Sequence, residues 1–378
     1  MKKRFSVYVR NAQSGPACYY RIMQYVEELD KGRAGVVHSA WTKKEFGTNL
    51  NCPDGRKKKV LQGILYLRIV RRRFVSLLVD MLLYRPQVIV IQREVVPHIL
   101  PPFFATLIRL IGKGADIIWD FDDDIFESGE ISAAERKILL EQSKKIVVVS
   151  DYLKQLLPAE YQKKTIVLPT SEKCFLRESF SNLLKRRRKT YPDAVSLIWI
   201  GTSGNLKYLD PVMEELDAAA GRMKMEGKKQ MKLMVVCNRS YKPPYRLRCL
   251  KMANIRWSRE SAQACMKEAH IAIMPLEDTR FAQGKGGFKL VQCIASGMPV
   301  IASDVGYNKN VVDGRAGYLI PNGSSGGWER AVMELAGNME CWENCSRGAY
   351  AVYREKFYFM DNLMVWKRIL IGRPERKW

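Results

Sequence analysis

Short hydrophobic runs bounded by turn residues recur along the chain, and most are followed by a segment in which hydrophobic residues return every three or four positions. The first pattern is typical of buried parallel strands, and the second predicts amphipathic helices. In the first part of the chain we expect strands at 4–9, 86–91, 116–124, 144–150 and 165–170. In the second part we expect them at 196–201, 231–237, 269–276, 298–303 and 317–321. This alternation predicts an α/β protein with two Rossmann-like parallel sheets.

A chain of 378 residues is long enough for two domains. We predict an N-terminal Rossmann-like domain over 1–180, a C-terminal one over 196–357, and a final helical segment over 358–378. Residues 181–195 are predicted to be the linker, because LysArgArgArgLys (185–189) and a proline make this stretch polar and charged.

The net charge of +24 favours an anionic partner, which includes nucleotide diphosphates, acidic membrane surfaces and nucleic acids. Charge alone does not choose among them. The nine cysteines form no CxxC pair, and no secretory signal pattern opens the chain, so a cytoplasmic setting is expected. The sequence contains no run of about 18 uncharged apolar residues, so we expect no membrane-spanning helix.

A basic amphipathic region at 56–84 has two interpretations. It combines ArgLysLysLys (56–59) and ArgArgArg (71–73) with regularly spaced leucines and isoleucines. Such a helix suits the headgroup layer of an anionic bilayer, where each charge is worth about 1 kcal/mol. The alternative is a domain helix whose basic face is solvated.

The stretch 283–306 joins a glycine-rich loop, a short helix and a buried strand. The glycines of the loop remove the Cβ atoms that would keep an anion from the backbone amides at the start of the helix 288–296. Helical geometry puts Lys289 and Gln292 on one side, and Lys285 joins them if the first turn begins that early. Two lysines there oppose the helix dipole unless an anion binds. The alternative is an ordinary crossover with a solvated lysine face.

The same residues carry a family resemblance. Lys289-Leu-Val-Gln292 followed by AlaSerGlyMetProValIleAlaSerAspValGly resembles the nucleotide-sugar signature of the retaining GT-B glycosyltransferases of family 4. In that family a lysine binds the donor diphosphate, and two glutamates eight positions apart complete the site. Those positions correspond here to Gly284 and Gln292, so both carboxylates are absent. The variant GlyLysGlyGlyPheLys (284–289) is similar to a bacterial polysaccharide-type branch.

The resemblance extends to the loop 202–209, where the family has an arginine and a lysine for the diphosphate. Lys207 holds the lysine position, whereas Thr202 or Ser203 replaces the arginine. The resemblance therefore implies that Lys207 and Lys289 together stabilise the departing diphosphate. The residues expected to bind the donor are Gly201, Ser203, Asn205, Lys285, Gly286, Gly287, Phe288 and Gln292.

The resemblance also implies an acceptor side at two strand ends in the first half. The strand at 86–91 leads to Gln92-Arg93-Glu94, and the strand at 116–124 ends in four carboxylates, which need cations or substrate hydroxyls nearby. Asp122 is a candidate for orienting an acceptor hydroxyl, and Arg93 for neutralising the cluster; a purely structural bridge is the alternative. In the resembling family the loop after the first strand approaches the donor phosphate or the acceptor, so the resemblance adds Gly15 and Arg21 to this side; a plain turn is the alternative. Asp123 is also assigned to the acceptor side. We expect neither a metal site nor a cofactor.

The resemblance implies two Rossmann-like domains in a GT-B arrangement, with the last helix packed against the first domain. It implies hexosyl transfer from a nucleotide diphospho-sugar to a glycan or lipid-linked acceptor with retention of configuration. The first rival is a non-catalytic nucleotide-sugar-binding or scaffold subunit, which the lost glutamates favour. The second rival is a nucleic-acid binder; only the charge favours it, because no recognised nucleic-acid motif is present.

Overall fold

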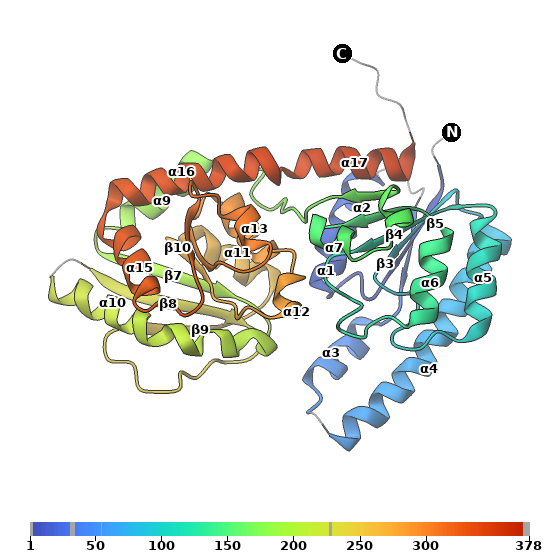
Figure 1. Cartoon of the computed structure of the whole chain (residues 1–378), viewed down its shortest axis with the longest axis horizontal. Helices are drawn as coiled ribbons and strands as arrows, with labels where there is room; N and C mark the ends of the chain where they lie inside the picture. Colours follow the sequence, from blue (N-terminus) through green and yellow to red (C-terminus); the bar gives the residue numbers. More distant parts are fainter. Residues whose placement is uncertain (1–2, 31–34, 54, 227–228, 373–378) are drawn as a thin grey trace, which may run out of the picture. The chain divides into compact units, whose positions relative to one another are not determined.

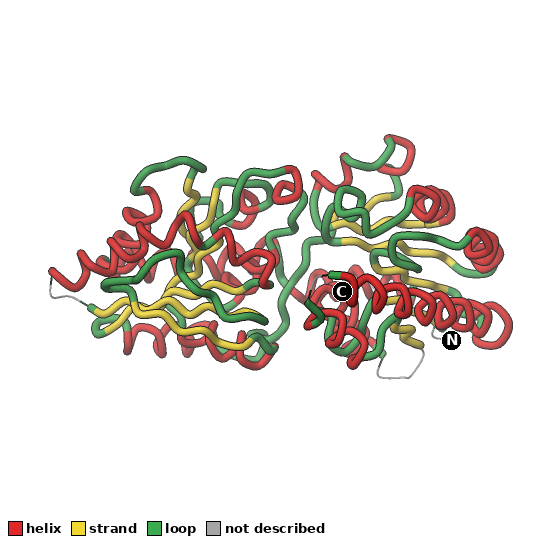
Figure 2. The backbone as a smooth tube through the Cα atoms, turned by 90° about the horizontal axis from the view of Figure 1, so that it is seen from below, coloured by secondary structure: helices red, strands yellow, loops and turns green. Residues whose placement is uncertain are grey.

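The structure is a computed structural model that describes residues 3–30, 35–53, 55–226 and 229–372. The chain divides into two compact units (Figure 1). Unit 1 runs through Thr170 and resumes at Met360, and unit 2 runs from Ser171 to Phe359. In each unit helices cover both faces of a parallel sheet (Figure 2).

The sheet of unit 1 has the order β2-β1-β3-β4-β5-β6, and all its neighbours pair in parallel. Its central strands are buried on both faces, which explains why Val88–Gln92 reads as one hydrophobic run. Trp119, Tyr8 and Phe104 lie in the core on one side of it. The strands are β1 (Phe5–Val9), β2 (Gly35–Ser39), β3 (Val88–Gln92), β4 (Asp116–Phe121), β5 (Ser143–Val148) and β6 (Thr165–Val167).

The helices of unit 1 include one long element, α4, which runs with α3 away from the rest of the unit (Figure 1). The other segments connect the strands, and α17 completes the unit from the far end of the chain. They are α1 (Pro16–Cys18), the π-helical turn η1 (Tyr19–Met23), α2 (Gln24–Leu29), α3 (Lys43–Asn51), α4 (Arg56–Val79), the π-helical turn η2 (Asp80–Tyr84), α5 (Pro102–Gly112), α6 (Ala133–Gln142), α7 (Asp151–Gln155), α8 (Ala159–Gln162) and α17 (Phe359–Ile371).

The sheet of unit 2 has the order β12-β11-β10-β7-β8-β9, again with parallel pairs throughout. Counted along the unit this is 3-2-1-4-5-6, the doubly wound order of dinucleotide-binding folds. The predicted α/β architecture of two Rossmann-like sheets is therefore confirmed. The strands are β7 (Ala194–Ile200), β8 (Gln230–Cys237), β9 (Lys251–Arg256), β10 (Ile271–Met274), β11 (Val300–Ser303) and β12 (Gly317–Ile320).

The helices of unit 2 pack on both sides of its sheet, where they contribute to two hydrophobic clusters. Asn338 separates the last two helices of the unit, and its side chain caps the second one. The elements are α9 (Phe180–Thr190), the 3-10 turns η3 (Ser203–Tyr208) and η4 (Asp210–Val212), α10 (Met213–Met225), α11 (Arg259–Glu268), α12 (Arg280–Gln283), α13 (Phe288–Ala295), α14 (Asn308–Val311), α15 (Gly327–Gly337) and α16 (Met339–Lys356).

The predicted linker at 181–195 is wrong. These residues form most of α9 and the start of β7, and the division between the units falls after Thr170. Arg187, within the basic run, is completely buried and donates to Ser296 O at 2.9 Å and to Met266 O at 2.6 Å. Charge alone therefore misled the assignment, since this arginine holds α9 onto unit 2. The last six residues of the predicted segment 358–378 lie outside the described residues.

Candidate functional site

The order in which the strands of the unit 2 sheet follow one another reverses between β7 and β10. In sheets of this kind, ligands bind at the point of reversal, outside the carboxyl ends of the strands. The chain leaves β7 through Gly201 and leaves β10 through Pro275. Tyr208 from the first loop packs with Leu276 from the second. The topology therefore places the candidate site between these two loops.

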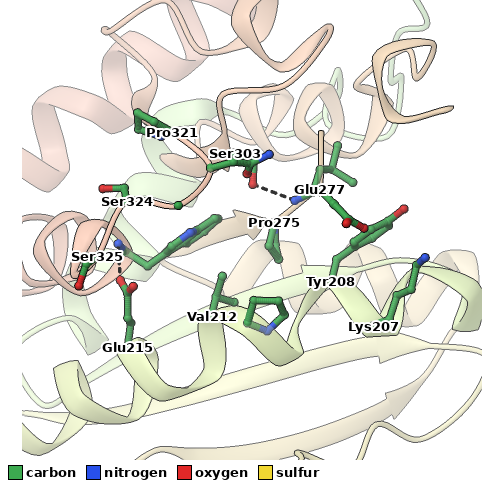
Figure 3. Close-up of a pocket in the computed structure, with 15 residues that line it drawn as sticks. Lys207, Tyr208, Val212, Glu215, Pro275, Glu277, Ser303, Pro321, Ser324 and Ser325 are labelled. Atoms are coloured by element: carbon green, nitrogen blue, oxygen red, sulfur yellow. Dashed lines mark hydrogen bonds between the residues drawn. The ribbon is translucent and has the colours of Figure 1, made fainter. Parts of the chain in front are cut away.

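A cavity of about 520 Å³ lies at this edge of unit 2 (Figure 3). This volume is within the usual range for small-molecule sites. Figure 3 shows the polar ends of Lys207, Tyr208 and Glu277 at one end of the cavity. The lining residues are Lys207, Tyr208, Pro211, Val212, Glu215, Pro275, Leu276, Glu277, Ser303, Pro321, Asn322, Gly323, Ser324, Ser325 and Trp328.

The other end of the cavity is formed by the start of α15, which is already capped. Glu215 accepts a hydrogen bond from the backbone N–H of Trp328 at 2.7 Å (Figure 3). It also accepts one from the backbone N–H of Glu329 at 3.1 Å. A carboxylate at this position occupies the amides that an anion would otherwise bind. Within the cavity, the end near Lys207 is therefore the one suited to a phosphate group.

The glycine loop before α13 adopts the conformation that its sequence predicts. Gly287 precedes the helix with φ of +61°, and a Cβ there would lie 3.0 Å from the ring of Tyr307. Lys285 reaches across to the other loop, where its Nζ donates to Asn205 Oδ1 at 3.1 Å. This bond links the loop that carries Lys207 to the loop that leads to Lys289.

Lys289 lies in a chain of hydrogen bonds. Its Nζ donates to Gln292 Oε1 at 3.3 Å, and Gln292 Nε2 donates to Glu172 Oε2 at 2.7 Å. Gln292 is 2% exposed and Glu172 is 1% exposed. Because Glu172 can only accept hydrogen bonds when ionised, it fixes the amide of Gln292 with the oxygen toward Lys289.

The ammonium group of Lys289 has too little negative charge nearby to offset the effect of its burial. Burial lowers the pKa of Lys289, while the negative charges of Cys293, when ionised, and Glu172 oppose the shift. An anion at this ammonium group would restore its pKa and would be bound more strongly than at an exposed lysine. The side chain of Lys289 is half-buried.

The predicted convergence of Lys207 and Lys289 is not seen in one cavity. Lys207 lines the cavity in Figure 3, whereas Lys289 is not among the described residues that line it. Its Nζ is held by Gln292 instead. The cation that contacts the loop 201–207 is Lys285, through Asn205.

The remaining donor candidates have local structural explanations as well. A Cβ at Gly201 would lie 2.4 Å from the ring of Trp199, so packing alone requires glycine there. The backbone N–H of Ser203 donates to Asn238 Oδ1 at 2.9 Å, which fixes the loop. The ring of Phe288 lies 5.7 Å from Lys289 Nζ. Gly286 lies in the same loop as Gly287.

The sheet of unit 1 changes direction between β1 and β3, and an arginine follows each of these strands. Arg93 has a left-handed φ of +65°, and its guanidinium contacts Asp122 at 2.8 Å, Glu130 at 2.9 Å and also Asp123. Arg10 contacts Glu130 at 2.8 Å. The pairing of Arg93 with the carboxylates is thus present, as both the functional and the structural interpretation require.

Two residues assigned to the acceptor side also have structural roles. Arg21 is 2% exposed, and its guanidinium bonds to Asp120 Oδ1 at 2.5 Å and to Leu168 O at 2.7 Å. Gly15 caps α1, where a Cβ would lie 2.9 Å from Asn11 O. Tight packing therefore explains both residues.

Sequence reasoning missed three charged residues of these sites. Glu172 is 120 residues from its partner Gln292, so no local motif contains both. Arg10, directly after β1, and Glu130, in the loop between β4 and α6, complete the Arg93 cluster. Although burial opposes ionisation, Arg93 and Arg10 hold the pKa of Glu130 down at about 2. The position of Arg10 directly after β1 was the only sequence signal.

The described part of the chain contains no group of three His, Cys, Asp or Glu side chains arranged to hold a metal ion. The same residues include no helix of the length and hydropathy needed to cross a bilayer.

Residues 194–338 match the family model described as "Glycosyl transferases group 1". This region holds Lys207, Lys285 and Lys289 together with the cavity of Figure 3. No curated protein sequence matches the chain.

Solved structures with similar folds cover almost the whole chain. Anabaena HepE, solved with UDP and glucose, is 11% identical with a TM-score of 0.63 over 97% of this chain and 99% of its own. Sucrose-phosphate synthase from Thermosynechococcus elongatus is 13% identical, with a TM-score of 0.63 over 97% and 98%. WaaG, a glycosyltransferase involved in lipopolysaccharide biosynthesis, is 14% identical, with a TM-score of 0.61 over 98% and 100%. The fold of this chain is therefore the GT-B fold.

Proposed function

We propose that this protein transfers a hexosyl group from a nucleotide diphospho-sugar to a glycan or lipid-linked acceptor, with retention of configuration, in bacterial surface polysaccharide synthesis. The observation that carries the proposal is the set of lysines at the sheet switch point of unit 2, inside the segment that matches the glycosyl transferases. The donor complex of HepE, which shares the fold, supports a nucleotide sugar as the ligand class.

In this proposal the donor occupies unit 2 and the acceptor occupies unit 1. The bond between the anomeric carbon and the diphosphate oxygen breaks, and its electron pair stays on the diphosphate. The acceptor oxygen forms the new bond on the same face and passes its proton to the departing diphosphate. Lys289, Lys207 and Lys285 stabilise the charge that develops on the departing diphosphate, an effect that is strongest where water is excluded. Gln292 offers its amide oxygen to the donor ribose. Asp122 orients the acceptor hydroxyl, and no protein nucleophile takes part.

The donor assignment is tested in two steps. A thermal-shift panel of nucleotide sugars selects the donor, since a ligand at 100 times its Kd adds about 2.7 kcal/mol to the free energy of unfolding. Release of free nucleotide, with and without acceptor extract, is then compared between wild type and Lys289→Ala. We expect Lys289→Ala to abolish the release of free nucleotide. Its melting temperature should stay within a few degrees of the wild-type value. Lys224→Ala, an exposed lysine on α10, is the matched control. Normal turnover in Lys289→Ala would refute the site.

A second candidate function, a nucleotide-sugar-binding scaffold subunit, is favoured by one observation. Gly284 and Gln292 stand where the resembling family has glutamates, and Thr202 or Ser203 stands where it has an arginine. The same assay separates the two functions. Tight binding of a nucleotide sugar without release of free nucleotide under any acceptor condition would support the scaffold.

We also propose that α4 contacts an anionic membrane. The helix carries no acidic residue, and its outer face exposes Val60 at 60%, Ile64 at 47% and Leu67 at 68%. The opposite face, with Leu65, Ile69, Arg73 and Leu77, is buried in unit 1. Cationic residues flank the exposed apolar stripe, as the charge of an anionic bilayer surface requires. They are Arg56, Lys57, Lys58, Lys59, Arg68, Arg71 and Arg72.

Vesicle co-sedimentation tests this contact. Wild-type protein should pellet with phosphatidylglycerol vesicles and not with phosphatidylcholine vesicles, and added salt should weaken the binding. Leu67→Glu should reduce the pelleted fraction severalfold. Met225→Glu, on a residue that is 82% exposed in unit 2, should not change it. Equal loss in both variants would mean that general charge, and not α4, determines the binding.

A further inference from the structure

We infer that unit 1 contains a binding pocket for a neutral sugar ring, located between α3, α4 and the loops that follow the first four strands of the unit. The pocket has a volume of about 300 Å³, at the lower end of the range for small-molecule sites. It is separate from the cavity in unit 2. Figure 1 shows α3 and α4 side by side at the edge of unit 1. Residues of both helices line the pocket.

The walls of the pocket combine flat apolar surfaces with polar groups. Leu65, Tyr66 and Ile69 come from the buried side of α4, and Trp41 comes from the loop after β2. The position of Trp41 is fixed through its backbone, because its N–H donates to Arg10 O at 2.9 Å and its carbonyl accepts from Asn11 Nδ2 at 2.9 Å. The pocket is therefore formed by rigid elements on two sides.

Two polar atoms of the pocket residues are buried without a hydrogen-bonding partner. They are the indole Nε1 of Trp41, which can only donate, and Oδ1 of Asn49, which can only accept. Buried polar atoms in folded proteins are nearly always paired, so an unpaired donor and an unpaired acceptor at one pocket call for a partner. A hydroxyl group can serve both, because it donates one hydrogen bond and accepts others.

The charges around the pocket exclude an anionic ligand. Arg10, the cation of the wall, is held at 2.8 Å by both Glu94 and Glu130. Arg10 and Arg93 hold the pKa of Glu130 low despite its burial, so this wall residue is ionised at neutral pH. A phosphate would meet a carboxylate and a guanidinium that is already paired. A neutral ligand with several hydroxyls and an apolar face fits both the unpaired atoms and the aromatic and aliphatic walls.

A pyranose ring has this chemistry. The inference rests on the proposed function for the role of the ring, which would be the sugar of the acceptor. The existence of the pocket's ligand is independent of that role, since unit 2 alone carries the proposed donor site. The two assignments can therefore fail separately.

The experiment uses the full chain and a panel of glucose, galactose, mannose, N-acetylglucosamine and their disaccharides, with saturation-transfer NMR to detect binding and titration to measure Kd. We expect at least one sugar to bind. Asn49→Ala removes the amide oxygen, and Trp41→Phe keeps an aromatic ring but removes the indole N–H. Each variant should weaken sugar binding about tenfold. Asn51→Ala is the matched control, because Asn51 lies on the same helix and its side chain bonds to Gly47 O within the helix. It should bind as wild type does.

Absence of binding by every sugar in the panel would overturn the inference, as would equal affinity in wild type, Asn49→Ala and Trp41→Phe. Thermal unfolding of each variant shows whether a loss of binding reflects a loss of fold. Nucleotide-sugar binding should be unchanged in all three variants. If sugar binding depends on Trp41 and Asn49 while no nucleotide is ever released from a donor, the pocket stands and the transferase function does not.

Discussion

Replacing Glu172 with glutamine should move the alkaline limb of the pH profile of donor turnover to lower pH. Glu172 contacts Lys289 only through the amide of Gln292, so the substitution removes a charge without touching the lysine. Burial already lowers the pKa of Lys289, and Glu172 is one of the groups that oppose this shift. Loss of the carboxylate therefore lets the lysine lose its proton at a lower pH.

The size of the effect follows from the geometry. The two hydrogen bonds, of 3.3 Å and 2.7 Å, with the amide between them, separate the two charges by at most about 8 Å. At an effective dielectric constant of about 20, this separation corresponds to an interaction of about 2 kcal/mol. The alkaline limb should thus move down by about one to one and a half pH units.

The assay is the dependence of kcat/KM on pH, which reports groups of the free enzyme. Glu178→Gln is the matched control, because Glu178 is 24% exposed and pairs with Lys267. In the double variant Glu172→Gln with Gln292→Glu, the carboxylate is placed next to the lysine, and the limb should return to the wild-type pH or above it. An unchanged profile in Glu172→Gln, or a double variant no better than the single one, would refute the reasoning.

Three other predictions concern stability and metal dependence. Burial raises the pKa of Glu135 to about 8, so between pH 4.5 and 8 the folded state keeps a proton that the unfolded state has lost. The wild type should therefore lose stability relative to Glu135→Gln as the pH rises through this range, by several kcal/mol at most. Urea unfolding at pH 4 and pH 9 checks this, with exposed Glu160→Gln as the control; a pH-independent difference would contradict it. Arg187→Leu should lower the free energy of unfolding by about 2–4 kcal/mol, because it leaves buried carbonyls unpaired. Arg186→Leu, at a side chain that is 50% exposed, should lower it little. Equal losses in the two variants would argue against the anchoring role of Arg187. Transfer should survive EDTA, since lysines supply the positive charge in the proposed site; loss of activity that Mg²⁺ or Mn²⁺ restores would contradict that.

The parallel strands could be predicted because burial on both faces gives continuous hydrophobic runs. The strands Gly35–Ser39 and Lys251–Arg256 were missed, and both lie at sheet edges with only one neighbour. Lys251–Arg256 is only partly buried, so its polar residues hide the pattern. Helix α9 was missed because it contains a buried arginine. In the sequence Arg187 counts as a charged and therefore solvated residue, but in the structure its guanidinium donates hydrogen bonds to backbone carbonyls and not to water.

The candidate site could be predicted where it is local in sequence. The glycine loop, Lys289 and Gln292 lie within one short stretch, and the start of α13 follows from the glycines. Glu172 could not be found in this way, because only the fold brings it to Gln292. The sugar pocket of unit 1 depends on two helices and on loops from several strands, and no motif in the sequence joins Trp41 to Asn49.

Helix α17 gives unit 1 an unusual order of assembly. Trp366 is 1% exposed, and Asn362 donates to Pro169 O at 2.6 Å, so α17 is an integral part of the first core. Unit 2, in contrast, is continuous from Ser171 to Phe359. During synthesis unit 2 is therefore complete before unit 1, which must wait for α17 with part of its apolar surface uncovered. A chaperone that binds the nascent chain would meet unit 1 as its main client, even though unit 1 is the first to be translated.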